Sequence, residues 1–91
     1  MASKKIKSVR FEPSEVDKGG MSKIIVDYFA DERSTITLSP GDVVSPESFE
    51  VAAKPEGGEP VEREVEALEV GNHTILVELA GYKKSARLHV K

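Results

Sequence analysis

The chain has 91 residues, the size of one small domain, so residues 1–91 are expected to fold as a single unit. Hydrophobic residues make up 38% and charged residues 32% of the sequence, and there is no cysteine, which excludes disulfide bonds and thiolate metal sites. The net charge of −3 argues against general nucleic-acid binding.

Turn-forming residues interrupt the chain at short intervals, and the segments between them are rich in Val, Ile, Thr, Phe and Tyr. Strands separated by turn signals every ~8–12 residues are typical of a β-sandwich or barrel. The sequence therefore predicts an all-β domain. The turn signals are Pro13, Gly19–Gly20, Pro40–Gly41, Pro46, Pro55, Gly57–Gly58, Pro60, Gly71 and Gly81.

The first predicted strand is KKIKSVRFEP, in which Val9 and Phe11 share one face. Ile6 lies on the other parity, which a β-bulge or an edge position would accommodate. Pro13 cannot donate a hydrogen bond to a ladder, so we expect it at an edge or where the chain changes sheet. The next segment, SKIIVDYFAD, is apolar on both faces and fits a central strand whose back is covered in part.

Two shorter strands are predicted after it. The segment STITL would turn Ile36 and Leu38 inward, and SPGD is a strong turn signal. The segment SFEVAAK alternates, with Phe49, Val51 and Ala53 on one side.

Residues 59–70, EPVEREVEALEV, are compatible with two structures. Local propensity favours a helix, which would bring Val61, Val65 and Leu68 onto one face. Because both neighbours are strands, a strand is the preferred interpretation; it would face Val61, Val65 and Ala67 inward, with the charged Arg63 awkwardly among them.

The last two predicted strands are the clearest. Residues 73–80 place Ile75, Val77 and Leu79 on one face. Residues 83–91 place Lys84, Ala86, Leu88 and Val90 on one face, and Lys83, Ser85, Arg87, His89 and Lys91 on the other. Gly81 lies between the two segments, where a chain reversal needs a positive φ, so the pair predicts a β-hairpin.

The two ends of the chain carry a resemblance to a known family. IKSVRFEPSEVDKGG resembles the opening of bacterial immunoglobulin-like (Big) domains, and VEALEVGNHTILVELAGYKKSARLHVK resembles their ending; together these segments cover just under half of the chain. The tryptophan and serine motif of the group 2 family is missing, and the chain has no Trp. The resemblance implies an immunoglobulin-like Greek-key β-sandwich of seven to eight strands. Such domains act as spacers, adhesins or attachment modules on bacterial surfaces and phage virions.

We therefore expect a non-enzymatic structural or adhesive module of a bacterial cell-surface protein or a phage virion. It would be extracellular, bind a protein or a cell-surface glycan, and pack against neighbouring copies of the same domain as a further candidate partner. The opening MASKKIKSVRF has no apolar core, so we expect no signal peptide in this chain. No apolar run approaches the ~18 residues of a membrane-spanning helix, so we expect no membrane insertion.

No enzymatic activity, cofactor or metal is expected. The chain contains no G-x-S-x-G, P-loop or H-E-x-x-H motif, and its only histidines, His73 and His89, are expected in solvent. The alternative is a small calcium- or carbohydrate-binding sandwich. Calcium would use loop carboxylates, whereas a sugar would stack on Tyr82 if that ring lies outside the core or its rim. The carboxylates are those of Asp27, Asp31, Glu32 and Asp42. A designed sandwich scaffold is a third hypothesis, against which the irregular positions of Ile6 and Arg63 argue.

The charges are segregated along the chain. Both ends are basic, and the first and last strands of immunoglobulin-like sandwiches run side by side, so the resemblance implies one basic edge. Its residues would be Lys5, Lys7, Arg10, Lys83, Arg87 and Lys91. An acidic patch would lie elsewhere, made of Glu62, Glu64, Glu66 and Glu69. The basic edge either protects an edge strand from aggregation or docks on an acidic partner or another copy.

Overall fold

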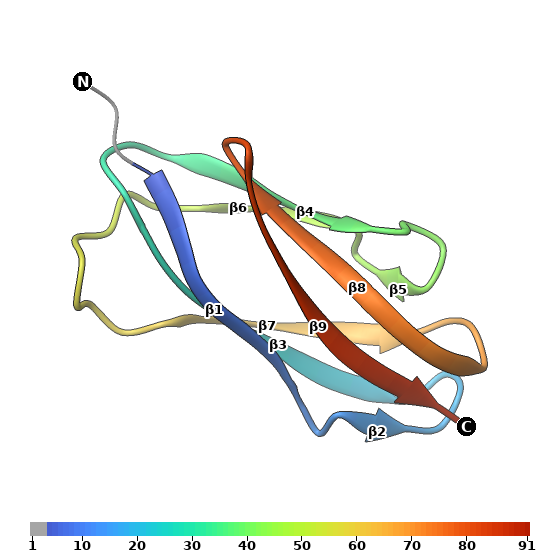
Figure 1. Ribbon diagram of the computed structural model, residues 1–91. Coiled ribbons are helices and arrows are strands. Elements are labelled where there is room, and N and C mark those ends of the chain that lie inside the picture. The colour runs from blue at the N-terminus through green and yellow to red at the C-terminus, as the bar shows by residue number, and fades with distance from the viewer. Residues whose placement is uncertain (1–3) are drawn as a thin grey trace.

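A computed structural model describes residues 4–91, and these residues form two packed β-sheets without a helix (Figure 1). The all-β sandwich is confirmed, but it has nine strands instead of seven or eight. The strands are β1 (Lys4–Glu12), β2 (Glu15–Val16), β3 (Met21–Ala30), β4 (Ser34–Ser39), β5 (Val44–Ser45), β6 (Ser48–Val51), β7 (Val61–Ala67), β8 (Gly71–Leu79) and β9 (Tyr82–Val90).

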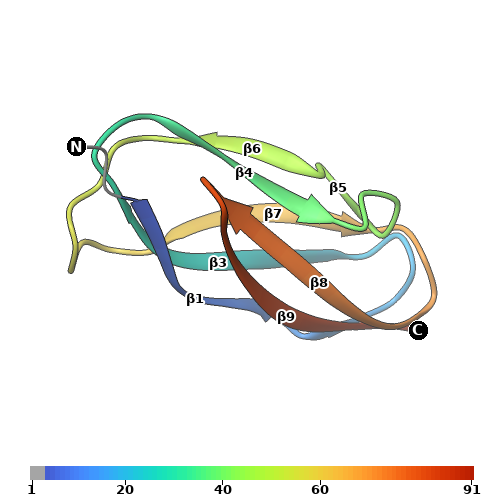
Figure 2. The ribbon, with the colours of Figure 1, turned by 45° about the horizontal axis from the view of Figure 1, so that its top comes forward.

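One sheet has four strands in the order β1-β3-β7-β5, and the other has five in the order β2-β9-β8-β4-β6. The chain crosses from one sheet to the other repeatedly, as Figure 2 shows for β3 to β4 and β6 to β7. The β2–β9 pair is parallel, whereas the other strand pairs are antiparallel. The strands β2 and β5 have two residues each and explain why the count exceeds the expectation.

The first strand changes sheet at Pro13. Before it, β1 pairs with β3 in the four-stranded sheet; after it, β2 pairs with β9 in the five-stranded sheet. The Ser22 hydroxyl donates to the Pro13 carbonyl at 2.7 Å, and the His89 N–H donates to the Ser14 carbonyl at 2.8 Å. The expectation that a proline without an N–H marks the change of sheet is confirmed.

A β-bulge explains the irregular parity of Ile6. The register of β1 against β3 shifts between Ile6 and Ser8, so one extra residue lies in β1 at this point. As a result Ile6 and Phe11 both point into the core, although residues five positions apart would point to opposite faces of a regular strand.

Residues 59–70 contain a strand, so the helix alternative is wrong. The strand β7 pairs with β3 on one side and β5 on the other, and these ladders outweigh the helical propensity of its glutamates. Val65 and Ala67 are buried as expected. Arg63 is exposed and lies over the Phe49 ring, with its guanidinium carbon 5.6 Å from the ring centroid. Ala53 is also exposed, because β6 ends at Val51.

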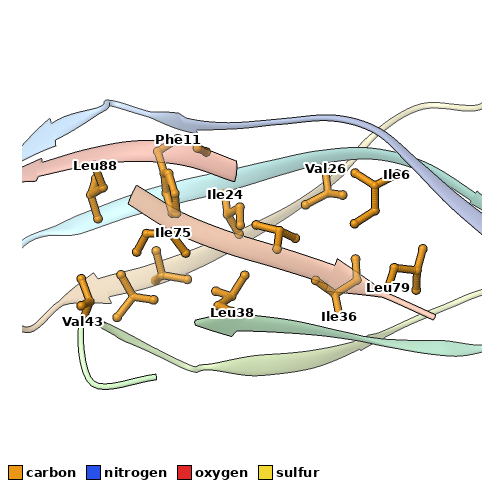
Figure 3. Packing of buried hydrophobic residues seen from close by; sticks show 14 of the residues in the cluster. Ile6, Phe11, Ile24, Val26, Ile36, Leu38, Val43, Ile75, Leu79 and Leu88 are labelled. Atoms are coloured by element: carbon orange, nitrogen blue, oxygen red, sulfur yellow. The ribbon is translucent and has the colours of Figure 1, made fainter. Parts of the chain in front are cut away.

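The core lies between the two sheets, where side chains of both layers meet (Figure 3). The buried positions alternate along β8, as for Ile75, Val77 and Leu79, whereas the central strand β3 also buries Ile25 on its other face, as its apolar sequence predicted. Each such side chain contributes about 1.5–3 kcal/mol by leaving water. Since the chain has no cysteine, this burial and the backbone ladders hold the two layers together.

The β8–β9 hairpin turns through Ala80 and Gly81, whose φ values are 50° and 88°. Two successive residues with positive φ make a type I′ turn, which matches the twist of the flanking strands. The expected conformation of Gly81 is confirmed. Ala80 has a Cβ, so its left-handed conformation is strained.

The hairpin therefore predicts opposite effects for two substitutions. Ala80→Asn should raise the free energy of unfolding by about 0.5–1 kcal/mol, because asparagine tolerates the left-handed region better than alanine. Gly81→Ala should lower it by about 1–2 kcal/mol, although no heavy atom lies within 4 Å of the added Cβ. Urea unfolding measures both, and a Gly81→Ala variant as stable as the original chain would contradict the argument.

Candidate functional site

The six residues of the expected basic edge lie along one edge of the sandwich but face in two directions. The strands β1 and β9 run near each other in both views while belonging to different sheets (Figures 1 and 2). Lys5 and Arg10 alternate with buried residues of β1, so they project from the outer face of the four-stranded sheet. Lys83 and Arg87 project from the outer face of the five-stranded sheet. The structure therefore does not gather them into one patch.

Several of these cations have acidic neighbours. Nζ of Lys7 lies 3.5 Å from Glu56, Nε of Arg10 lies 2.8 Å from Glu12, and Nζ of Lys91 lies 3.3 Å from Glu15. Exposed pairs of this kind contribute about 0–1 kcal/mol each. Within residues 4–91, no ion pair joins an acid to the remaining three, which are Lys5, Lys83 and Arg87.

The acidic residues of β7 share a face with part of the basic group. Glu62, Glu64 and Glu66 are exposed on the outer face of the four-stranded sheet, separated from β1 by the single strand β3. Lys23 of β3 lies 3.8 Å from Glu62. Glu69 follows the end of β7 and is also exposed. This outer face is thus of mixed charge, instead of having basic and acidic regions far apart.

The carboxylates proposed for calcium do not converge. Asp31 and Glu32 lie in the turn before β4, whereas Asp42 lies in the turn after it, so the length of the strand separates them. Asp27 lies within β3, where its carboxylate is 3.7 Å from Lys54. No group of three metal-binding side chains occurs in the part of the chain that the structure describes. These four residues therefore do not form a calcium site.

Tyr82 and the two histidines occupy different environments. Tyr82 is 50% exposed at the start of β9, which is the exposure that a sugar contact requires. His89 is exposed as expected, with Nδ1 at 3.1 Å from Glu15. His73 is half-buried, with Nε2 at 2.8 Å from the Glu69 carbonyl oxygen, so its ring is only partly in solvent.

A hollow of about 460 Å³ lies on the outer face of the five-stranded sheet, at the ends of β8 and β9 near the C-terminus. The register pairs Asn72 with His89 and Thr74 with Arg87. These four side chains project outward as walls, because the buried residues of both strands project the other way. The remaining lining residues are Ser14, His73 and Leu88.

Only part of this hollow could be found from the sequence. Arg87 was singled out by its charge, and the alternation along β8 and β9 predicts that it and His89 face outward. Asn72, Thr74 and Ser14 were missed, because their placement depends on the hairpin register and on the change of sheet at Pro13. The outward positions at the start of β8 and the end of β9 are all polar, and this pattern is the sequence signal that could have identified a polar surface there.

A second hollow of about 440 Å³ lies on the opposite outer face and is lined by residues of β1, β3 and β7. Its acids surround one cation, Lys23, which pairs with Glu62. Met21 adds an exposed apolar side chain. The lining therefore has three acids against one cation, and that cation is already paired, so this hollow offers no unpaired basic group and is the weaker candidate.

The titration of Tyr28 is shifted, and the surroundings of this residue are structural. Burial raises the pKa of the Tyr28 phenol, and nearby Arg63 lowers it less than burial raises it. The hydroxyl donates to the Ala52 carbonyl at 2.8 Å. Nζ of Lys54 donates to the Tyr28 carbonyl at 2.7 Å and lies 5.1 Å from the ring centroid. This network fastens the segment after β6 to β3 at a site without an open cleft.

No protein-family model matches the chain, and no curated protein matches it significantly. No helix among residues 4–91 could cross a membrane. The functional argument therefore rests on the geometry of the sandwich and of the hollow lined by Arg87.

The environment of Tyr28 predicts a pH dependence. The folded state favours the neutral phenol, so this contribution to stability is complete below the ordinary pKa of ~10 and is lost as the pH rises through the higher folded pKa. In a Tyr82→Phe variant, Tyr28 is the only tyrosine and its ionisation can be followed by ultraviolet absorbance. We expect a higher midpoint in the folded protein than in urea, and equal midpoints would contradict the assigned burial.

Proposed function

We propose that this chain is a non-catalytic, immunoglobulin-like module that serves as a spacer and attachment unit in a bacterial cell-surface protein or a phage virion. The observation that carries the proposal is the path of the chain through the molecule. The first and last strands run in the same direction along an elongated body. The chain therefore enters near one end of this body and leaves at the other.

The body measures 43 × 21 × 16 Å along its principal axes. The strand β1 starts towards one end of the long axis and the C-terminus lies at the other (Figures 1 and 2). Because β2 continues β1 and pairs in parallel with β9, the first and last strands run the same way. Copies joined in series would therefore extend along one line and increase the reach of whatever they present.

The immunoglobulin-like assignment is supported by the same strands. The segments that resemble Big domains form most of β1, all of β2, the last three residues of β7, and all of β8 and β9. These strands provide the change of sheet at Pro13 and the parallel contact of β2 with β9. The resemblance thus falls on the residues that define the entry and exit of the chain.

Attachment is supported by the outer face of the five-stranded sheet. This face has a polar hollow with an unpaired guanidinium among residues 4–91, and the same sheet exposes Tyr82 at the start of β9. A carbohydrate-binding domain is the second candidate function, favoured by these two features. Proteins, cell-surface glycans and neighbouring copies are the proposed partners.

The spacer role predicts the shape of a two-copy chain. Two domains fused in series should have a maximum dimension close to twice the 43 Å length of one domain, because the chain leaves each copy in the direction in which it entered. Small-angle X-ray scattering measures this dimension. A pair folded back side by side, with a maximum dimension close to that of one copy, would contradict the proposal.

The proposed location on a cell surface or a virion predicts that the domain is accessible from outside the intact cell or virion. An antibody raised against the domain should label intact source cells or virions, and mild protease treatment of the intact particles should remove the label. An antibody against an internal protein serves as the control for leakage. Labelling that occurs only after lysis would refute the surface or virion assignment.

A further inference from the structure

We propose that the hollow lined by Arg87 binds an acidic sugar, with the sugar carboxylate on Arg87 and its hydroxyls on the surrounding polar side chains. The inference rests on the proposed attachment function and names the ligand for it. It assigns a role to four polar side chains that form no ion pair or hydrogen bond within residues 4–91, those of Ser14, Asn72, Thr74 and Arg87.

The shape of the hollow follows from the antiparallel register. Directly opposite residues on one face of such a pair have Cβ atoms about 4.5–5.5 Å apart. The pairs Asn72–His89 and Thr74–Arg87 are adjacent on the outward face, so their four side chains stand at the corners of a small rectangle. The backbone at Leu88 forms the floor, since its side chain is only 1% exposed. The hollow of about 460 Å³ that these side chains border has room for a single sugar ring.

Arg87 is the uncommitted cation of the hollow. The other two basic groups nearby both contact Glu15, with His89 Nδ1 at 3.1 Å and Lys91 Nζ at 3.3 Å. Arg87 has no such ion pair with any acid of residues 4–91, and its neighbour across the ladder, Thr74, is neutral. A guanidinium presents donors in a planar fork that matches a carboxylate, so this is the group the hollow selects.

The other walls suit hydroxyl groups. The hydroxyls of Ser14 and Thr74 and the amide of Asn72 can each donate and accept a hydrogen bond, as sugar hydroxyls do. The backbone carbonyl of Ser14 accepts the His89 N–H at 2.8 Å, which fixes this residue at the rim. None of the seven lining residues is an exposed apolar side chain that would hold a peptide side chain. The lining therefore favours an acidic sugar over an acidic peptide.

Glu15 positions the imidazole of His89. Its contact with Nδ1 orients the ring and leaves Nε2 available for a ligand hydroxyl. Because Glu15 belongs to β2, the change of sheet at Pro13 delivers both the rim residue Ser14 and this orienting carboxylate to the end of β9.

An open site with a few polar contacts binds weakly, with a dissociation constant on the order of millimolar. Weak binding suits a module that is present in several copies, because linked or clustered sites reach a much higher overall affinity without new contacts.

Nuclear magnetic resonance titration of the ¹⁵N-labelled chain tests the proposal. The probes are D-glucuronate and D-glucose, which differ at the carboxylate. We expect saturable amide shifts for residues 72–74 and 87–89 with glucuronate, and at least about tenfold weaker binding of glucose. Arg87→Gln should weaken glucuronate binding by about tenfold or more. Lys83→Gln is the matched control: it removes another cation on the same face of β9 that forms no ion pair within residues 4–91, and it should leave the affinity unchanged.

Several results would overturn the proposal. Equal binding of glucose and glucuronate, or an unchanged affinity in Arg87→Gln, would remove the role of the guanidinium. Absence of shifts at tens of millimolar glucuronate would remove the site, and binding of tetraglutamate without binding of glucuronate would replace the sugar by a peptide. Binding of glucose 6-sulfate alone would make the ligand a sulfated sugar.

Arg87 is exposed, so an unchanged amide spectrum of the ligand-free Arg87→Gln variant verifies its fold. None of these results changes the surface labelling or the two-copy scattering, so failure of the sugar site is distinguishable from failure of the module function.

Discussion

The structure depends on one constraint: at Pro13 the chain must leave the four-stranded sheet and join the five-stranded sheet. The segment that follows is then hydrogen-bonded to both layers. After Pro13 the chain pairs with β9, and the following loop bonds to both sheets. The Gly19 N–H donates to the Ala67 carbonyl at 2.7 Å, and the Lys18 N–H donates to the Lys91 carbonyl at 3.1 Å. A chain without cysteine thereby joins its layers by backbone hydrogen bonds around a buried hydrophobic core.

The same constraint determines what the molecule presents to its surroundings. Parallel pairing of β2 with β9 makes the chain enter and leave in one direction, which is the basis of the spacer proposal. It also places Ser14 and Glu15 beside His89, which completes the hollow on the outer face. Stability and the proposed binding site therefore share a single structural element, because the residues that close the sandwich edge also build the rim.

The sequence predicts what depends on a single strand and misses what depends on the pairing of strands. Alternation in 73–80 located Ile75 and Leu79 in the core, and the parity break at Ile6 indicated a bulge or an edge position, of which the structure shows the bulge. Residues 59–70 were ambiguous, because glutamates favour a helix and the deciding ladders with β3 and β5 involve distant segments. The basic residues of the last strand could be assigned to its outward face, but those of the first and last strands were wrongly grouped, since grouping them requires knowing which sheet each strand joins. The strained φ of Ala80 has no signal in the residue itself.

Lys83 and Arg87 of β9 occupy different positions on the strand, and these positions suit them to two different roles, edge protection and ligand binding. The strand β2 pairs with β9 at His89 and Val90. Within residues 4–91, the earlier residues of β9 have no strand partner on that side, so they lie at an open edge of the sheet. Lys83 lies along that open part, where an ammonium opposes pairing with another chain at little cost. Arg87 differs in two respects: it lines a hollow, and its planar guanidinium can hold a carboxylate in a fixed orientation. Edge protection requires only charge and would be served equally by lysine at position 87. Recognition of a carboxylate requires the geometry that arginine adds, which is why the binding role is assigned to Arg87 and the protective role to Lys83.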